Sequence, residues 1–534
     1  MRMKHSKMVL GFAVVALFLG LSSCKSESLA ASRNVSADMT WKPSWGQVQG
    51  FVRLDSNSGS NTGDGTSAVP TNGTAPLQAE WAKGVLNDTV STYLYSIAVD
   101  GQGNIYAVGN VLGIQTSQLG DGINVSGAGP KGNALIAKYD SSGQALWAQS
   151  TGTETAGESN FSSIAVDESG NAYVVGTIRG TVTFSDTVKV EGKYEGTNLV
   201  LVKYNSLGYA QWARTLARSD GLSAFNSVAV DKEGNVIAAG YAWKSFGAEE
   251  GSVALSPRGP KYYAIPEKSG GGALLAKFDS SGNALWAVQV GGMRGSGFYS
   301  VALGDTGGIY AAGYIAGNGT YDFGNGVLLA VSGSQPSNRT FVALVKYSAS
   351  GKAQWAHSLE RAGADNCDFR SIRLDHDGNV YASGEMFGPE PFQFGNAVTV
   401  QGPSKRRNLL VMKYDTSGKP QWGRSLVGGR GDFEFHATAI DDRLIYLSGS
   451  FEIKTGKETY DFGGNVMTKV ENHIGRMEFL IAYDHSGVPR WVVMPPSKGQ
   501  GDLRIRSICL PDNGSMVVGG TIYSEGALDL LRPA

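Results

Sequence analysis

Short runs of alternating apolar and polar residues dominate the chain from about residue 45 to residue 520. A typical run, SIAVDGQGNIYAVG, begins at Ser96 and contains an Asp-x-x-Gly-Asn turn followed by a second apolar stretch. Alternation with a period of two, interrupted by such a turn, predicts a β-hairpin. Similar phrases begin 64 to 73 residues apart at Ser96, Ser163, Ser227, Ser300, Ser371, Ala437 and Ser507.

A second repeated phrase lies between the copies of the first. It reads ALIAKYDSSGQALWA at residues 134–148 and predicts another hairpin, this time around an Asp-Ser-Ser-Gly turn. Six copies follow copies of the first phrase, whereas a seventh lies ahead of them all at residues 51–84, with a Gly/Ser/Thr/Asn-rich insertion at residues 60–76. Each repeating unit therefore contains two hairpins, which predicts a four-stranded antiparallel sheet.

The order of the half-units predicts the topology. The chain begins with the second half of a unit and ends with the first half. In a closed ring these two halves pair with each other and complete one sheet. We therefore predict an all-β fold, a seven-bladed β-propeller whose last blade is closed by two N-terminal and two C-terminal strands. The expected blades span about 94–160, 161–224, 225–297, 298–368, 369–434, 435–504, and 505–534 together with 45–93.

The two phrases also indicate a family. SIAVDxxGNxYxxG and KYDSSGxxxW resemble the repeats of bacterial SBBP-type β-propeller proteins, over roughly residues 45–530. The resemblance implies the propeller fold. It implies no particular activity, because propellers carry many unrelated functions.

Residues 1–23 predict a lipoprotein signal peptide rather than a folded segment. Three basic residues precede an apolar stretch at residues 8–21, which is too short for a comfortable transmembrane helix. The sequence Leu-Ser-Ser-Cys that ends at Cys24 resembles the lipobox of bacterial lipoproteins, in which the cysteine becomes the lipidated first residue. An ordinary secretory leader with an incidental cysteine is the alternative.

The expected mature chain begins with an anchor and a tether. Acylation of Cys24 would hold the protein at a lipid bilayer, and the polar, aperiodic residues 24–44 are typical of a flexible linker. Lys25 follows the cysteine where an aspartate would favour the inner membrane of enteric bacteria, so by analogy we expect the outer membrane, on its periplasmic side or at the cell surface. We expect a monomer.

Composition narrows the possible partners and cofactors. A formal net charge of −1 argues against a nucleic-acid partner, which would call for a basic face. The cysteines that remain after lipidation, Cys367 and Cys509, lie two units apart, and we expect both to be free thiols. Zinc-type Cys/His spacings, a GxSxG elbow, a Walker A loop and a Rossmann fingerprint are absent from the sequence, so we expect neither a cofactor nor a bound metal.

Two conspicuous residue types recur so regularly that we interpret them as structural. A tryptophan ends each second phrase and is expected to pack between blades, because a binding site rarely uses seven equivalent positions. The tryptophans are Trp81, Trp147, Trp212, Trp286, Trp355, Trp422 and Trp491. A basic residue of the third strand is expected to cover apolar surface with its stem. These basic residues are Arg53, Lys138, Lys203, Lys277, Lys346 and Lys413.

Residues that depart from the repeat are better functional candidates. The connections between second and third strands vary most, and non-repeating loops on a rigid scaffold commonly carry recognition. One of them contains Trp243, Tyr262 and Tyr263, and another contains Lys405, Arg406 and Arg407. Arg430-Gly431-Asp432 spells the integrin-binding tripeptide, although other units also have glycine-rich loops at this place.

These features predict a non-enzymatic, lipid-anchored binding or scaffold protein of the cell envelope with a protein or glycan partner. The alternative is a polysaccharide-acting hydrolase or lyase with carboxylates gathered at the mouth of the channel. Asp305, Asp441 and Glu385 are candidates for such a site. Calcium at the Asp-x-x-Gly turns is a further option, because carboxylate and carbonyl oxygens are suitable ligands.

Overall fold

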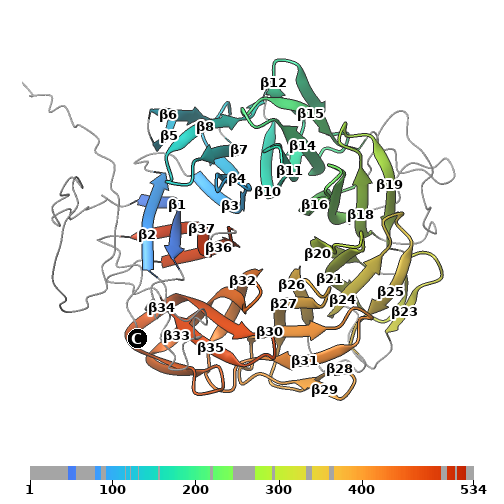
Figure 1. Cartoon of the computed structure of the whole chain (residues 1–534), viewed down its shortest axis with the longest axis vertical. Coiled ribbons are helices and arrows are strands. Elements are labelled where there is room, and N and C mark those ends of the chain that lie inside the picture. Colours follow the sequence, from blue (N-terminus) through green and yellow to red (C-terminus); the bar gives the residue numbers. More distant parts are fainter. Residues whose placement is uncertain are drawn as a thin grey trace, which may run out of the picture.

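The computed structural model describes residues 46–55, 78–85, 92–114, 116–120, 122–129, 131–153, 157–216, 221–243, 271–290, 295–331, 339–359, 366–494, 502–511 and 514–524. It confirms the predicted architecture: seven four-stranded antiparallel sheets form the blades of a ring (Figure 1). The predicted signal peptide, Cys24, the tether, Tyr262 and Tyr263 all lie outside these residues. Within the described residues, no helix has the length and apolar character needed to cross a membrane.

Six blades are built from consecutive parts of the chain, and each strand pairs with the next in order. Blade 1 contains β3 (Thr92–Val99), β4 (Ile105–Leu112), β7 (Gly132–Tyr139) and β8 (Ala145–Ser150). Blade 2 contains β10 (Glu158–Val166), β11 (Ala172–Arg179), β14 (Asn198–Tyr204) and β15 (Ala210–Arg214). Blade 3 contains β16 (Ser223–Val230), β17 (Val236–Ala242), β18 (Gly272–Phe278) and β19 (Ala284–Gln289).

The next three blades repeat this plan. Blade 4 contains β20 (Ser296–Leu303), β21 (Ile309–Ala316), β24 (Thr340–Tyr347) and β25 (Ala353–His357). Blade 5 contains β26 (Cys367–Leu374), β27 (Val380–Phe387), β30 (Arg407–Tyr414) and β31 (Pro420–Arg424). Blade 6 contains β32 (Asp432–Ile440), β33 (Leu444–Asp461), β34 (Met467–Asp484) and β35 (Pro489–Val493).

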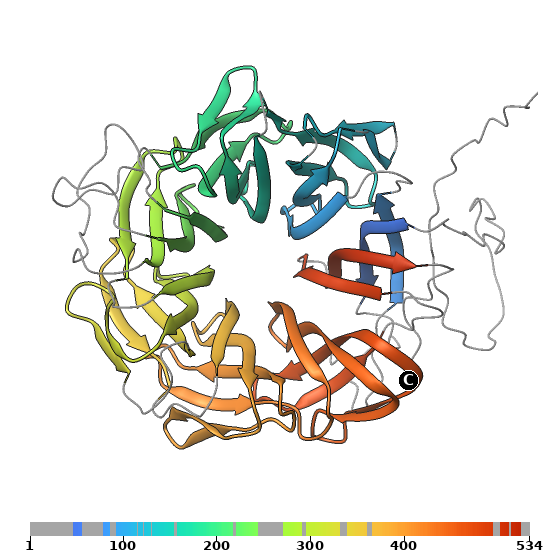
Figure 2. The same ribbon diagram turned by 180° about the vertical axis from the view of Figure 1, so that it is seen from behind.

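The seventh blade joins the two ends of the chain, as the sequence predicts. Its strands are β36 (Asp502–Cys509), β37 (Ser515–Ser524), β1 (Gly46–Asp55) and β2 (Gln78–Val85), in that order across the sheet. β1 and β37 form an antiparallel ladder from Gly46 opposite Ser524 to Asp55 opposite Ser515. This pairing closes the ring, which Figure 2 shows from behind. The first strand of each blade lies nearest the centre (Figure 1).

Most of the connections between second and third strands carry additional β-structure. The small strands of these connections are β5 (Thr116–Gly120), β6 (Ile123–Ser126), β12 (Thr181–Ser185), β13 (Val188–Glu191), β22 (Gly319–Asp322), β23 (Leu328–Val331), β28 (Phe392–Gly395) and β29 (Val398–Val400). A further small strand, β9 (Gly152–Thr153), lies between blades 1 and 2 along the chain and pairs with β12. In blade 6 the segment 460–476, which the sequence suggests is an extended loop, instead continues β33 and β34 as a long hairpin. Alternation of buried residues such as Tyr460 and Val470 with exposed ones explains this extension.

The tryptophans hold neighbouring blades together, as expected. The indole N–H of Trp147 donates to the main-chain oxygen of Ser206 in the next blade (3.1 Å), and Trp212, Trp286 and Trp422 make equivalent bonds. The acceptor always lies in the turn between the third and fourth strands. A glycine of that turn, such as Gly208, packs directly on the indole ring. The tryptophan interpretation is therefore confirmed for these four residues.

The repeated basic residues also have structural contacts. Lys138, Lys203, Lys346 and Lys413 each lie over the ring of a second-strand tyrosine, with the ammonium nitrogen 4.7–5.1 Å from the ring centre. Lys277 instead pairs with Asp231 at 3.0 Å. The lysine–tyrosine contacts tie the third strand to the second, and the Lys277–Asp231 pair ties it to the turn between the first and second strands.

Candidate functional site

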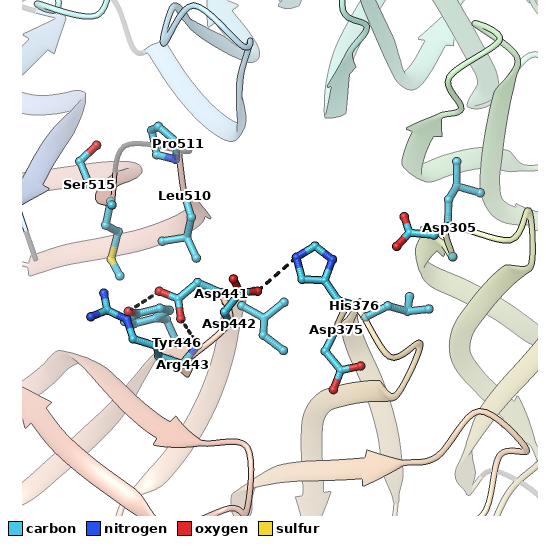
Figure 3. A pocket seen from close by; sticks show the side chains of 16 residues that line it. Asp305, Asp375, His376, Asp441, Asp442, Arg443, Tyr446, Leu510, Pro511 and Ser515 are labelled. Carbon is cyan, nitrogen blue, oxygen red and sulfur yellow. Dashed lines mark hydrogen bonds and ion pairs between the residues drawn. The ribbon is translucent and has the colours of Figure 1, made fainter. Parts of the chain in front are cut away.

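A pocket of about 510 Å³ lies at one end of the central channel (Figure 3). The turns that join the first and second strands of blades 4, 5, 6 and 7 surround it. Because these turns occupy the same place in each repeat, residues at equivalent positions converge on one space. The pocket combines an apolar floor from Leu303, Leu374, Ile440 and Leu510 with a polar rim.

Two rim aspartates are held by their own turns. The carboxylate of Asp375 accepts hydrogen bonds from the main-chain N–H and side-chain amide of Asn379 and from the hydroxyl of Tyr381. Burial alone would raise the pKa of Asp375, but the bonds from Asn379 and Tyr381, together with the charge of Lys413, outweigh it and lower the pKa. This carboxylate is therefore ionised and fixed in place.

Asp441 plays the same part in blade 6. It accepts hydrogen bonds from the main-chain N–H groups of Arg443 and Leu444 and from the hydroxyl of Tyr446, at 2.7–2.9 Å. Although this turn reads Asp-Asp-Arg-Leu rather than Asp-x-x-Gly, it is also an Asx-type turn, in which a side-chain oxygen satisfies nearby main-chain donors. The repeated aspartates stabilise their own turns, and they line the pocket because these turns surround it.

The residues that differ between repeats supply the accessible groups. His376 points from blade 5 toward Asp442 of blade 6, with 3.2 Å between Nε2 and Oδ1 (Figure 3). The two side chains are 83% and 78% exposed, so this bridge is weak and open to a ligand. Asp305 faces them from blade 4. The lining contains four carboxylates, on Asp305, Asp375, Asp441 and Asp442, against one guanidinium, on Arg443.

A smaller hollow of about 340 Å³ adjoins this pocket at Leu510 and Pro511. It lies between blade 7 and blade 1, beside Asp100. The guanidinium of Arg53 borders it and donates to the main-chain oxygen of Ser141 at 2.7 Å. The side chain of Arg53 therefore has a structural contact here as well.

A second concentration of charge lies at the other end of the blades. Asp368 is the second residue of β26, whereas Leu374, on the pocket floor, ends it, a separation of about 20 Å along an extended strand. Asp368 and Glu385 are opposite each other on β26 and β27. Both are buried, and burial raises the pKa of each carboxyl group even though Arg370 favours the charged forms.

Arg370 organises this second cluster. Its guanidinium donates to both oxygens of Asp368 (2.8 and 3.2 Å), lies 4.0 Å from Glu385 and stacks over the ring of Tyr299. Glu385 in turn accepts a hydrogen bond from the main-chain N–H of Phe435 in the next blade. The carboxylates thus also join blades 5 and 6.

Further charged residues continue the cluster through blade 6. Arg407 pairs with Asp432 at 2.8 Å, and Arg406 lies 3.5 Å from the same carboxylate. Nearby, Arg476 pairs with Glu434. The imidazole of His436 and the carboxylate of Glu478 form a buried pair at 3.3 Å.

The structure separates the sequence candidates into distinct groups. Asp305 and Asp441 line one pocket, but Glu385 lies at the opposite end of the blades. Arg406, Arg407 and Asp432 come together, so the aspartate of the Arg-Gly-Asp tripeptide is engaged by arginines. Lys405 and Arg430 are exposed, and Trp243 is 42% exposed. The sequence did not indicate His376 and Asp442 as site residues, because both lie in repeated hairpin turns that we interpreted as structural.

Within the described residues, no group of three or more His, Cys, Asp or Glu side chains is placed to hold a metal ion. Cys367 is buried, and both Cys367 and Cys509 are free thiols, as expected. The polar groups at the pocket rim can accept hydrogen bonds and attract cations. The pKa of the rim aspartate Asp375 is lowered rather than raised.

Comparison with known proteins leaves the function open. No protein-family model matches the chain. Over 138 residues it is 30% identical to an uncharacterized WD repeat-containing protein of Acanthamoeba polyphaga mimivirus, a stretch that covers 24% of this chain and 9% of that protein. The chain therefore spans only a small part of the length of this relative.

Several solved propellers are similar in shape. Virginiamycin B lyase from Staphylococcus aureus matches with 9% identity and a TM-score of 0.34, covering 81% of this chain and 99% of the lyase. The periplasmic gluconolactonase of Pseudomonas aeruginosa matches with 12% identity and a TM-score of 0.30, covering 84% and 99%. Such similarity concerns the fold alone, and we draw no functional conclusion from it.

Proposed function

We propose that the chain is a lipid-anchored binding protein of the cell envelope, and that the pocket at the channel mouth holds a basic segment of a partner protein. The carrying observation is the lining of that pocket, which contains four carboxylates and one guanidinium. A concave site lined mainly by one sign of charge concentrates ligands of the opposite sign. The apolar floor favours the long aliphatic stems of lysine and arginine.

The proposed anchoring rests on the leader and Cys24. A lipidated cysteine followed by a polar tether would place the propeller beside a membrane, where a partner protein of the envelope is accessible. The outer membrane is the proposed location. The propeller itself supplies a rigid frame, because closure through β1 and β37 fixes the turns that form the pocket.

Peptide binding tests this function. Fluorescence anisotropy would be measured with labelled octapeptides rich in lysine and arginine, and with glutamate-rich and neutral peptides of equal length. We expect the basic peptides to bind and the double variant Asp305→Asn/Asp442→Asn to weaken binding about tenfold, since each lost charge pair contributes on the order of 0.5–1 kcal/mol. Asp186→Asn, which removes an exposed carboxylate from the β12–β13 hairpin, is the matched control. Equal binding by all peptides, or an equal effect of the control, would argue against this proposal.

A second candidate function is cleavage of a polysaccharide. Asp368 and Glu385 favour it, because buried carboxyl groups with raised pKa values are typical of general acids. Release of reducing ends from envelope polysaccharides, abolished by Glu385→Gln, would support this function. Unchanged release by the variant would exclude Glu385 as the general acid, and no release by the native chain would argue against this function.

A further inference from the structure

Two histidines lie beside the acidic pocket at positions where the other repeats have a different residue. His376 is the second residue of the turn between β26 and β27 of blade 5, and the other six copies of this turn have no histidine there. His485 is the second residue of the turn between β34 and β35 of blade 6. The other copies have a small residue at this position, namely Ser56, Ser141, Ser206, Ser280, Ala349 and Thr416. The repeat therefore does not require an imidazole at either place.

His376 lines the pocket directly. Its Nε2 atom lies 3.2 Å from the Oδ1 atom of Asp442, across the rim between blades 5 and 6 (Figure 3). The imidazole is 83% exposed, so it takes up a proton from solvent without any change in the fold. A protonated His376 would compete with a basic ligand for the carboxylate of Asp442.

His485 lies behind the rim and contacts both of these turns. Its Nε2 atom donates a hydrogen bond to the main-chain oxygen of Asp441 at 2.9 Å, because a carbonyl oxygen can only accept. The neutral ring therefore carries its single proton on Nε2, and the unprotonated Nδ1 atom lies 3.9 Å from Oδ2 of Asp375. Proton uptake at Nδ1 would replace these two neighbouring acceptors by an ion pair. Asp375 lines the pocket, so this pair would reduce the negative charge that a ligand meets.

The charged groups around each imidazole determine how strongly it responds to pH. Those on the turn of His376 and on the facing turns are Asp305, Asp375, Asp377, Asp441, Asp442 and Arg443. Those around His485 are Asp375, Asp441, Asp484, Lys413, Arg424 and Arg490. Carboxylates outnumber the guanidinium around His376, whereas cations offset them around His485. We therefore expect His376 to supply the larger part of the response.

Imidazole is the side chain whose charge ordinarily changes between about pH 5 and 8. With both rings neutral, the four carboxylates and Arg443 give the pocket a formal charge of −3, which two protonated imidazoles beside it would reduce to −1. A smaller negative charge attracts a basic ligand less strongly. We propose that the pocket binds its basic ligand at neutral pH and releases it in acid, through protonation of His376 and His485. This inference rests on the proposed function, because it concerns the same pocket and the same class of ligand.

Fluorescence anisotropy of the purified full chain at about pH 8 and about pH 5.5, at constant ionic strength, tests this regulation. The probe is a labelled octapeptide of arginine and glycine with blocked ends, because arginine keeps its charge at both pH values. Aspartates ordinarily titrate near pH 3.9, and the hydrogen bonds from Asn379 outweigh burial and lower the pKa of Asp375. We expect binding to be about three- to tenfold weaker at the lower pH, the effect of two added and partly screened charges.

Substitutions assign this response to the two histidines. His376→Gln, at an exposed position that should not disturb folding, is expected to remove most of the loss in affinity, and His376→Gln/His485→Gln should bind equally at both pH values. His376→Lys places a permanent charge at the rim and should weaken binding about two- to threefold at the higher pH. His473→Gln, on β34 outside the pocket lining, is the matched control and should keep the response of the native chain.

The outcomes separate this inference from the proposed function. If the peptide binds at neither pH, the proposed function fails and the regulation fails with it. Equal binding by the native chain at both pH values, or a loss in acid that persists in both glutamine variants, would overturn the regulation alone. Weaker binding in acid that His376→Gln reduces and His473→Gln leaves unchanged would support it.

Discussion

The indole N–H of Trp147 donates to the main-chain oxygen of Ser206 across the boundary between blades 1 and 2, at 3.1 Å. Two residues later in the same turn, Gly208 has a φ of +87°, and a Cβ built there would lie 2.7 Å from the indole. Trp147 thus contributes both a hydrogen bond and close van der Waals packing to the contact between blades 1 and 2. The same arrangement recurs around the ring, which explains why both residues belong to the repeat.

Substitution of Gly208 tests this contact. Gly208→Ala should lower the free energy of unfolding by about 2–4 kcal/mol, because it combines an unfavourable φ with overpacking against the indole. Gly113→Ala is a matched control, since its φ is +86° but nothing lies within 4 Å of the added Cβ. The control should cost only about 1–2 kcal/mol in chemical denaturation. Equal losses for the two variants would show that the indole contact contributes nothing.

Closure of the ring makes a prediction about the two ends of the chain. Val52 and Val518 are directly opposite on β1 and β37, and both face the same apolar cluster. The double variant Val52→Cys/Val518→Cys should therefore oxidise to a disulfide that changes electrophoretic mobility. Val52→Cys/Val517→Cys should not, because Val517 faces a different cluster on the other side of the sheet. Cross-linking in the second pair alone would contradict the register.

Glu385 should give the protein a distinctive pH dependence. Its pKa is raised in the folded state, so ionisation destabilises the native chain as pH increases from the unfolded pKa, about 4.3, to the folded value. Below this window the penalty is absent, and above it the penalty is complete. Glu385→Gln should therefore gain stability relative to the native chain as the pH rises above about 4.3, as measured by thermal unfolding. A pH-independent difference would rule out this account.

We expect Asp432 to stabilise the fold rather than to act as part of an exposed adhesion motif. Its side chain is 15% exposed and binds Arg407. Asp432→Asn should destabilise the chain by about 1–3 kcal/mol, because it leaves the half-buried guanidinium of Arg407 without its charged acceptor. Arg430→Ala, in the same tripeptide, should change stability by less than about 0.5 kcal/mol, because Arg430 is exposed. Thermal unfolding of the two variants would distinguish these outcomes, and a reversed order would be inconsistent with the pairing.

The architecture could be predicted because each repeated residue has a role in its own strand or turn. Alternation specifies the strands, the Asp-x-x-Gly turns fix the hairpins, and the split unit at the two ends specifies closure through β1 and β37. The sequence alone did not distinguish the long hairpin of blade 6 from a loop, because this hairpin is longer than those of the other repeats.

The sites were harder to predict because they depend on convergence across blades. Asp305 and Asp442 belong to turns 137 residues apart in the sequence, and only the ring brings them to one pocket.

Site-specific photocrosslinking in intact cells tests the central claim, that the channel mouth is the binding site. A photoreactive phenylalanine analogue would replace His376 at the rim or Asp186 on a distant hairpin. We predict a discrete protein adduct from position 376 that is absent from position 186 and lost when Asp305 and Asp442 are changed to asparagine. Adducts of equal yield from both positions, or an adduct unaffected by the asparagine changes, would contradict the account.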